Sequence, residues 1–156
     1  MKFRAVSGIV FTIIVTIAFS VAQGNEQAVQ LSELPPAVRA AVQHQSSGAT
    51  VRGFSKEREN GETYYEAELK VKGHNKDVLM DSGGTVVEVE EEVAFRSLPA
   101  RVQSGLRKQA SGGRIVKVES VTKKDKLVAY EAQVVKHGKR SELQVGPEGE
   151  ALKQAE

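Results

Sequence analysis

The sequence predicts an α+β fold made of two tandem repeats, each with one helix packed on an antiparallel meander of about four strands. Three observations lead to this prediction. The segment from Leu34 to Glu92 is echoed by the segment from Leu98 to Gln154. Each copy begins with apolar residues at helical spacing and continues with apolar residues at every second position. A pattern that occurs twice predicts one architecture used twice.

The two copies align at two offsets. At a spacing of 64, Leu34-Pro35 and Val38 correspond to Leu98-Pro99 and Val102. At a spacing of 65, Tyr65-Glu66-Ala67 corresponds to Tyr130-Glu131-Ala132. We therefore expect one extra residue in the second copy and place it in the turn from Lys123 to Lys126.

The first 22 residues read as a signal peptide. Lys2 and Arg4 precede an apolar run from Ile9 to Phe19, and Ser20-Val21-Ala22 has the small residues of a cleavage site. We expect the mature chain to begin at Gln23 and to be periplasmic or secreted, with membrane contact only through this segment. The alternative is an uncleaved anchor, although the run is shorter than the ~20 residues that span a bilayer.

The remaining chain divides into a polar, flexible lead (23–33), a first repeat (34–95) and a second repeat (96–156). A unit of about 60 residues buries little core by itself. We therefore expect the repeats to share either an interface or a continuous sheet, and the sequence does not decide between the two. The chain has no cysteine, which excludes disulfides.

In the first copy, apolar residues from Leu34 to Val42 predict a helix that ends before Gly48. Strands are expected at 51–58, 65–71, 76–81 and 85–92, and Asn60-Gly61 is a strong hairpin signal. In the second copy, a helix from Leu98 to Leu106 precedes strands at 115–121, 128–136, 141–145 and 150–153. Gly105 weakens this helix by up to ~1 kcal/mol, which close packing could offset. The predicted core is Leu34, Val38, Val42, Tyr65, Leu69, Val71, Leu98, Val102, Leu106, Tyr130 and Val134.

Charge differs between the two halves. Residues 23–96 carry 8 basic and 13 acidic residues, net −5, whereas residues 97–156 carry 12 and 7, net +5. Either the halves attract each other or both are ordinary solvated surfaces. The basic residues are scattered and aromatic residues are few, which argues against a nucleic-acid partner.

The acidic residues have structural explanations in the sequence. Glu88 and Glu90–Glu92 are expected to protect an edge strand from pairing with other chains, in preference to binding a metal. Glu66 and Glu68 are expected on a wet strand face, where water screens their charges. We therefore predict no metal site and no cofactor.

The sequence also predicts no enzyme. Asp81-Ser82-Gly83-Gly84 resembles the segment around a protease nucleophile, but Ser82 falls at a predicted turn without a base or an oxyanion hole. His44, His74 and His137 lack metal-ligand spacing with one another or with carboxylates. No catalytic residue is assigned.

The Leu-Pro-x-x-Val helix starts, the Tyr-Glu-Ala strands and the Asp-x-x-Gly turn at Asp81 resemble the PepSY-like family. The helix-on-meander plan is also similar to that of the secreted beta-lactamase inhibitor protein. The resemblance covers both repeats and implies an exported protein that binds or inhibits protein partners and is not an enzyme. The second copy departs from the pattern with Gly146-Pro147-Glu148-Gly149, and no inhibitory loop can be transferred.

The expected function is an exported, non-enzymatic binding module that inhibits or regulates a secreted or periplasmic protein or peptide partner. Tyr64, Phe54 and His74 are the candidate partner-binding residues. Tyr64 is out of phase with Tyr65 and should point away from the core, and aromatic side chains are favoured interface anchors. The alternative is a small envelope structural or assembly protein that acts through strand edges. The oligomeric state stays open.

Overall fold

The computed structural model describes residues 26–152. The predicted signal peptide and the start at Gln23 therefore lie outside the described residues. Within residues 26–152 the elements are two α-helices, two 3-10 helices (η) and eight strands: β1 Gln27–Ala28, η1 Leu31–Glu33, α1 Pro36–Gln45, β2 Thr50–Glu59, β3 Glu62–Val71, β4 His74–Asp81, β5 Val86–Glu92, η2 Phe95–Ser97, α2 Ala100–Ala110, β6 Arg114–Lys123, β7 Lys126–Lys136 and β8 Lys139–Val145. Neither described α-helix is long and apolar enough to cross a membrane.

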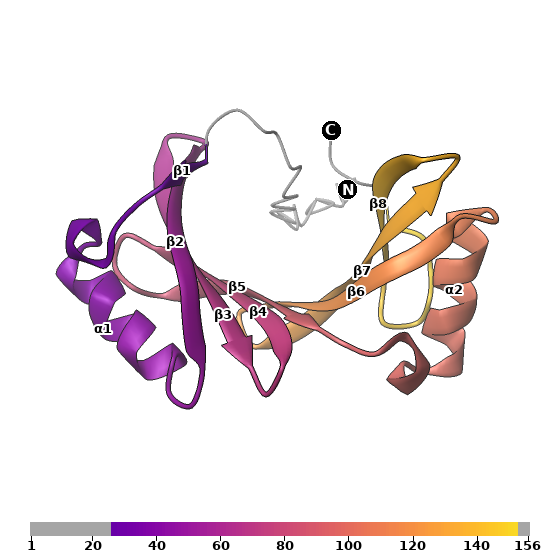
Figure 1. Ribbon diagram of the computed structural model, residues 1–156, viewed down its shortest axis with the longest axis horizontal. Coiled ribbons are helices and arrows are strands. Elements are labelled where there is room, and N and C mark those ends of the chain that lie inside the picture. The colour runs from indigo at the N-terminus through magenta and orange to yellow at the C-terminus, as the bar shows by residue number, and fades with distance from the viewer. Residues whose placement is uncertain (1–25, 153–156) are drawn as a thin grey trace, which may run out of the picture.

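The eight strands form one antiparallel sheet in the order β1 to β8 (Figure 1). The predicted architecture of two tandem helix-plus-meander repeats is therefore wrong. β5 pairs with β4 on one side and with β6 on the other, so that Glu90 is the cross-strand partner of both Asp77 and Val121. This pairing satisfies the backbone groups of β5, which would otherwise form an exposed edge.

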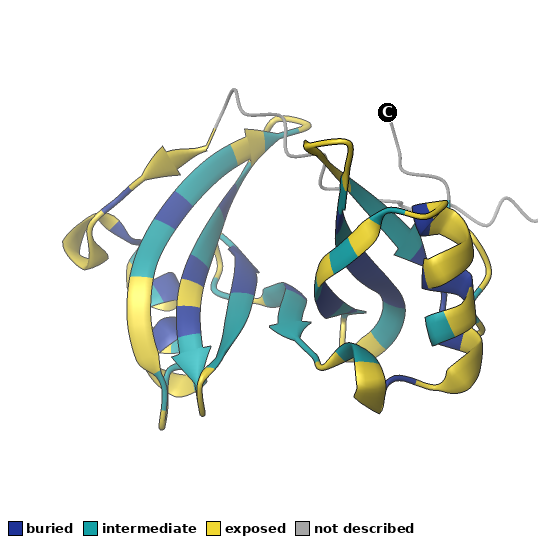
Figure 2. Cartoon of the chain, turned by 45° about the vertical axis from the view of Figure 1, so that its right-hand side comes forward, coloured by how far each residue is buried: buried dark blue, intermediate teal, exposed yellow. Residues whose placement is uncertain are grey.

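The sheet is strongly bent, and both α-helices lie on its convex side (Figure 1). Helix α1 contacts β4, and α2 contacts β6, β7 and β8. Exposed residues gather on the helices and the hairpin turns, whereas the central strands are mostly buried or half-buried (Figure 2). The opposite side of the sheet, here called the concave face, carries no helix of the described part of the chain.

Two apolar clusters fill the space between the sheet and the helices. The first contains Leu34, Val38, Val42 and Leu69, and the second is centred on Leu106. The predicted core is confirmed at these positions and at Leu98, Val102, Tyr130 and Val134, whereas Tyr65 and Val71 are only half-buried. Burial of these side chains is the main source of stability for a sheet covered on one side.

The register shows that the internal correspondence begins before Leu34. Gln27 pairs with Lys56 as Glu91 pairs with Ser120, and each residue is 64 positions from its counterpart. η1 and η2 are also 64 positions apart. The segment predicted to be a flexible lead thus contains a short strand and a 3-10 helix, and β1 is the counterpart of the end of β5.

The extra residue of the second copy is a β-bulge. Thr122 pairs with Leu127 and Val121 pairs with Ala129, which leaves Val128 without a cross-strand partner. The hairpin before it has two residues, as the Asn60-Gly61 hairpin does, because Lys123 pairs with Lys126. The expected insertion in the turn is therefore wrong, and Val128 shifts the register inside the strand.

Two equivalent glycines let the sheet approach the helices. A Cβ on Gly84 would lie 2.5 Å from the carbonyl oxygen of Ala37, and a Cβ on Gly149 would lie 2.2 Å from that of Arg101. Gly105 in turn lies against the backbone of Gly149, in the last turn, and this close packing can offset its low helix propensity. The last predicted strand, 150–153, is reduced in the described residues to one bridge between Val145 and Ala151.

Candidate functional site

Rows of cross-strand partners cross the concave face. Residues that alternate with the core positions, such as Glu66 and Glu68 between Tyr65, Ala67 and Leu69, point away from the helices. One row contains Ser55, Glu66, Leu79, Glu88 and Lys123. The next contains Gly53, Glu68, Asp77, Glu90, Val121 and Ala129, and the third contains Glu92, Glu119, Glu131 and Gln144.

Carboxylates from five adjacent strands meet in the middle of this face. We call this group the acidic centre, and it consists of Glu66, Glu68, Asp77, Glu88, Glu90, Glu119 and Glu131. Glu88, Glu119 and Glu131 are buried, whereas Glu68 is exposed. The bend of the sheet brings neighbouring side chains on its inner side together, which removes water from charged groups that a flat strand face would leave wet.

Some of these carboxylates have partners within the chain. Glu88 forms an ion pair with Lys123 at 3.0 Å, and Glu119 forms one with Lys117 at 2.5 Å. Glu131 accepts a hydrogen bond of 2.7 Å from the side-chain amide of Gln144. These contacts compensate part of the cost of removing charge from water.

For Glu66, Asp77 and Glu90, burial and neighbouring carboxylates raise the pKa. Burial and the carboxylate of Glu131 raise the pKa of Glu90 to about 9. Burial and Asp77 raise the pKa of Glu66 to about 8, and burial and Glu119 raise that of Asp77 to about 6. At neutral pH the acidic centre therefore holds protons as well as negative charge.

Three of these groups are close enough to share one ligand. An oxygen of Asp77, one of Glu90 and one of Glu119 lie within 4.8 Å of one another. Carboxylate oxygens at such distances can hold a divalent cation. Here, however, the ammonium group of Lys117 already contacts Glu119, so the chain supplies a positive charge of its own.

Apolar side chains complete the concave face. Leu79, Val121 and Ala129 are buried on this face although none of them belongs to the two cores beneath the helices. Tyr64 joins them and is only 9% exposed. Its hydroxyl group donates a hydrogen bond of 2.9 Å to Glu62. On this face, therefore, buried apolar side chains lie beneath and between the charged groups.

The three residues predicted to bind a partner are not brought together. Tyr64 lies on the concave face, as its phase indicated, but it is buried and not an exposed anchor. Phe54 is half-buried and packs against the core on the convex side. His74 begins β4 and lies 2.7 Å from Glu91, also on the convex side.

The acidic residues of β5 do not protect an edge, and that expectation is wrong. β5 lies in the interior of the sheet, and its alternation separates Glu88 and Glu90 on the concave face from Glu91 on the convex face. The wet face expected for Glu66 is also incorrect, because Glu66 is half-buried, and this burial raises its pKa. Between the oppositely charged halves, the ion pair of Glu88 with Lys123 joins β5 to β6.

The serine and histidine candidates have structural roles or lie on the surface. Asp81 accepts hydrogen bonds of 2.9 Å from the backbone N–H groups of Gly83 and Thr85, which closes the turn around exposed Ser82. His44 and His137 are exposed on α1 and in the turn after β7.

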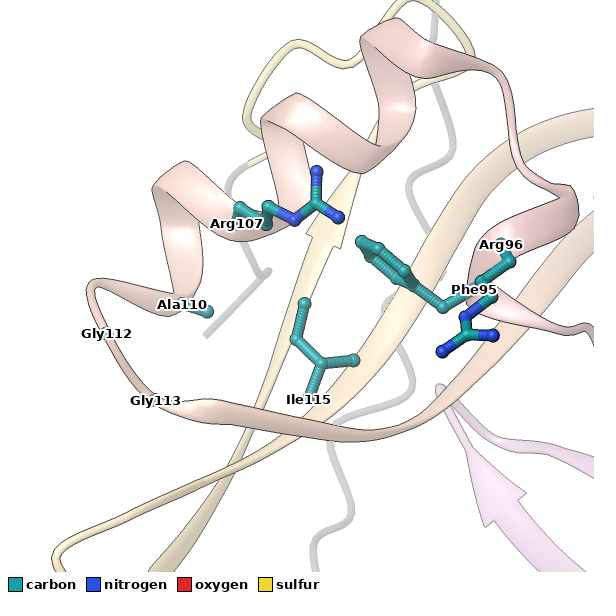
Figure 3. Close-up of a pocket in the computed structure, with 7 residues that line it drawn as sticks. All are labelled: Phe95, Arg96, Arg107, Ala110, Gly112, Gly113 and Ile115. Atoms are coloured by element: carbon teal, nitrogen blue, oxygen red, sulfur yellow. The ribbon is translucent and has the colours of Figure 1, made fainter.

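A separate hollow of about 430 Å³ lies at the convex side of the second half (Figure 3). Phe95 and Arg107 point toward each other, and the guanidinium carbon is 4.9 Å from the centre of the ring. Arg96 turns away from them, and Ile115 lines the floor. This cation–π contact between Phe95 of η2 and Arg107 of α2 stabilises the packing of the two elements.

Comparison with known proteins identifies the fold. No family model and no curated protein matches the sequence. A protein described as periplasmic from Bacteroides eggerthii is similar in structure, with a TM-score of 0.63, 21% identity and coverage of 78% of this chain and 88% of that one. A BLIP-like protein from Bacteroides fragilis has a TM-score of 0.58 at 21% identity, covering 78% of this chain and 86% of that one.

A DUF2874 family protein from Bacteroides ovatus is also similar, with a TM-score of 0.61, 20% identity and coverage of 77% of this chain and 85% of that one. At these identities the likeness concerns the fold. It supports the BLIP-like plan, whereas membership of the PepSY-like family stays a prediction. The chain thus shares its fold with a BLIP-like protein and with a protein described as periplasmic.

Proposed function

We propose that this chain is an exported, non-enzymatic binding module that recognises a protein or peptide partner on the concave face of its sheet. Its place of action is the periplasm or the cell exterior, where it inhibits or regulates that partner. The leader motif at residues 1–22 and the similarity to a protein described as periplasmic support export. The similarity to a BLIP-like protein supports the binding role.

The proposal rests mainly on a difference between the two sides of the sheet, of which only one is covered by helices in the described residues. The convex side is covered by α1 and α2. The concave side carries no helix in the described residues, yet it concentrates apolar residues and partly desolvated carboxylates from β3 to β7. Groups that are already partly removed from water cost less to desolvate further when a partner covers them.

One observation favours the alternative of an envelope assembly protein. β1 pairs only with Lys56 and Ser55 of β2, so within the described residues the segment from Thr50 to Arg52 has no strand on its outer side. An open edge of this kind can accept a strand from another chain.

Site-specific photo-crosslinking in the exporting cell tests the proposal. A photoreactive amino acid replaces one exposed residue in each of three places. Glu68 reports on the concave face, Lys108 on the outer side of α2, and Ser141 on the edge strand β8. Each variant is expressed as the full chain, and its adducts are identified by mass and by peptide sequencing.

We expect Glu68 to give one discrete adduct with a different protein, and Lys108 to give none. Adducts of the chain with itself from Ser141, with none from Glu68, would instead support the assembly protein. Equal, diffuse labelling from all three positions would contradict a dedicated binding face.

A further inference from the structure

We infer that the partner of the concave face presents arginine or lysine side chains, which pair with Glu68, Asp77 and Glu90. This inference rests on the proposed function and adds the chemistry of the partner. Its basis is an imbalance of charge on the concave face, a surface that lies away from both helices.

Three lysines beside the acidic centre already have partners within the chain. Lys123 pairs with Glu88, Lys117 pairs with Glu119, and Lys70 donates a hydrogen bond to Asn75. Among residues 26–152, no ion pair links Glu66, Glu68, Asp77 or Glu90 to a basic side chain. Protons and Lys117 neutralise part of this charge. The acidic groups that remain in excess can attract a cation from outside the described chain.

The arrangement fits a long basic side chain. Asp77 and Glu90 are cross-strand partners, and their oxygens lie within 4.8 Å of each other, so one guanidinium group can bridge them. Leu79, Val121 and Ala129 lie on the same face and are buried. These buried side chains fix the strands that carry Asp77 and Glu90, so the two carboxyl groups are held in place for a charged group that approaches from outside.

Binding of such a side chain must also displace protons. Charged groups from five strands surround Glu90. They are Glu66 on β3, Asp77 on β4, Glu88 on β5, Lys117 and Glu119 on β6, and Glu131 on β7. Burial among these mainly negative groups keeps Glu90 protonated at neutral pH. A neighbouring cation favours the ionised form, so the pKa falls and a proton is released. Affinity should therefore rise as the pH rises.

Calorimetric titration with a short oligo-arginine peptide tests this inference. The binding enthalpy is measured at one pH in phosphate and in Tris, whose ionisation enthalpies differ, and the difference gives the protons released. The titration is repeated with Asp77→Asn/Glu90→Gln. The matched control is Glu91→Gln, which removes the neighbouring charge on the convex side of the same strand.

We expect proton release by the wild-type chain and a loss of about tenfold or more in affinity in the double variant, with Glu91→Gln unchanged. Equal weakening by Glu91→Gln would show non-specific attraction and overturn the inference. Saturable binding of Ca²⁺ alone that is lost in the double variant would also overturn it and assign a metal site. Failure here together with a discrete adduct from Glu68 would leave the proposed function standing with a partner of different chemistry.

Discussion

Asp77 and Glu90 face each other across β4 and β5, so two carboxyl groups occupy one cross-strand pair in the interior of the sheet. Like charges directly opposite each other destabilise a sheet, and burial adds to this cost. Burial is the main cause of the raised pKa of both groups, with Glu119 adding to that of Asp77 and Glu131 to that of Glu90.

The first prediction concerns pH and stability. The pKa is raised to about 9 for Glu90, to about 8 for Glu66 and to about 6 for Asp77. At pH values between the ordinary carboxyl pKa and these raised pKa values, the folded chain therefore holds more protons than the unfolded chain. As a result, the free energy of unfolding falls as the pH rises through this range. Urea unfolding between about pH 5 and pH 9 should show this decrease.

Glu90→Gln isolates the contribution of one group. Near pH 8 the wild-type chain must take up a proton at Glu90 when it folds, and glutamine needs none. The variant should therefore raise the free energy of unfolding by about 1–3 kcal/mol near pH 8 and change little near pH 5. Glu91→Gln serves as the control on the convex side. A variant that is less stable than the wild type at the higher pH would contradict the account of the acidic centre.

A second prediction concerns the core. Leu69 on β3 is almost completely buried in the core beneath α1, and Leu106 on α2 is completely buried between this helix and the sheet. Truncation of either to alanine should lower the free energy of unfolding by about 2–5 kcal/mol. Leu31, which is 49% exposed, provides the control, and Leu31→Ala should cost no more than about 0.5 kcal/mol. Similar losses at Leu31 and Leu106 would contradict the assigned packing.

A third prediction concerns the close contact between α2 and the last turn. Alanine is a better helix former than glycine by about 1 kcal/mol, so propensity alone predicts that Gly105→Ala stabilises the chain. Its Cβ would instead lie 2.2 Å from the carbonyl oxygen of Gly149, and we expect a loss of about 1–3 kcal/mol. Ser104→Ala at the preceding exposed position should be neutral or slightly stabilising. Thermal unfolding of both variants distinguishes packing from propensity.

A fourth prediction concerns export. Residues 1–22 have the charge and hydrophobicity pattern of a signal peptide, although they lie outside the described residues. Mass spectrometry of the chain recovered from the cell envelope should find an N-terminus near Gln23. Recovery of the uncleaved chain with its original Met1 would favour the anchor.

Local patterns in the sequence predicted much of the fold because their causes are local. Asn60-Gly61 forms the expected two-residue hairpin, and both residues adopt the positive φ angles that this turn requires. The buried positions of Leu69 and Leu106 follow from periods of two and 3.6 residues. Gly105 packs closely against the backbone of Gly149, a contact of the kind that could offset its low helix propensity.

Non-local features were missed for a physical reason. Alternation shows that Glu88 and Glu90 share one face, but it does not show that β5 pairs with β6, because this pairing depends on backbone groups common to all residues. The bulge at Val128 leaves no signal beyond the change of offset. The acidic centre was missed because strand patterns do not reveal the bend that removes water from Glu66 and Glu90.

The central claim is that the concave face is the binding face, and carboxyl-group footprinting of the complex with the crosslinked partner tests it most directly. A carbodiimide reagent labels accessible carboxylates, and mass spectrometry compares the free and bound chain at Glu68, Glu91 and Glu148. All three are accessible in the free chain, but Glu68 lies on the concave face, Glu91 on the convex face, and Glu148 in the last turn next to Arg101. We predict that binding protects Glu68 and leaves Glu91 and Glu148 labelled as before. Protection of Glu91 or Glu148 with Glu68 unchanged would contradict the claim.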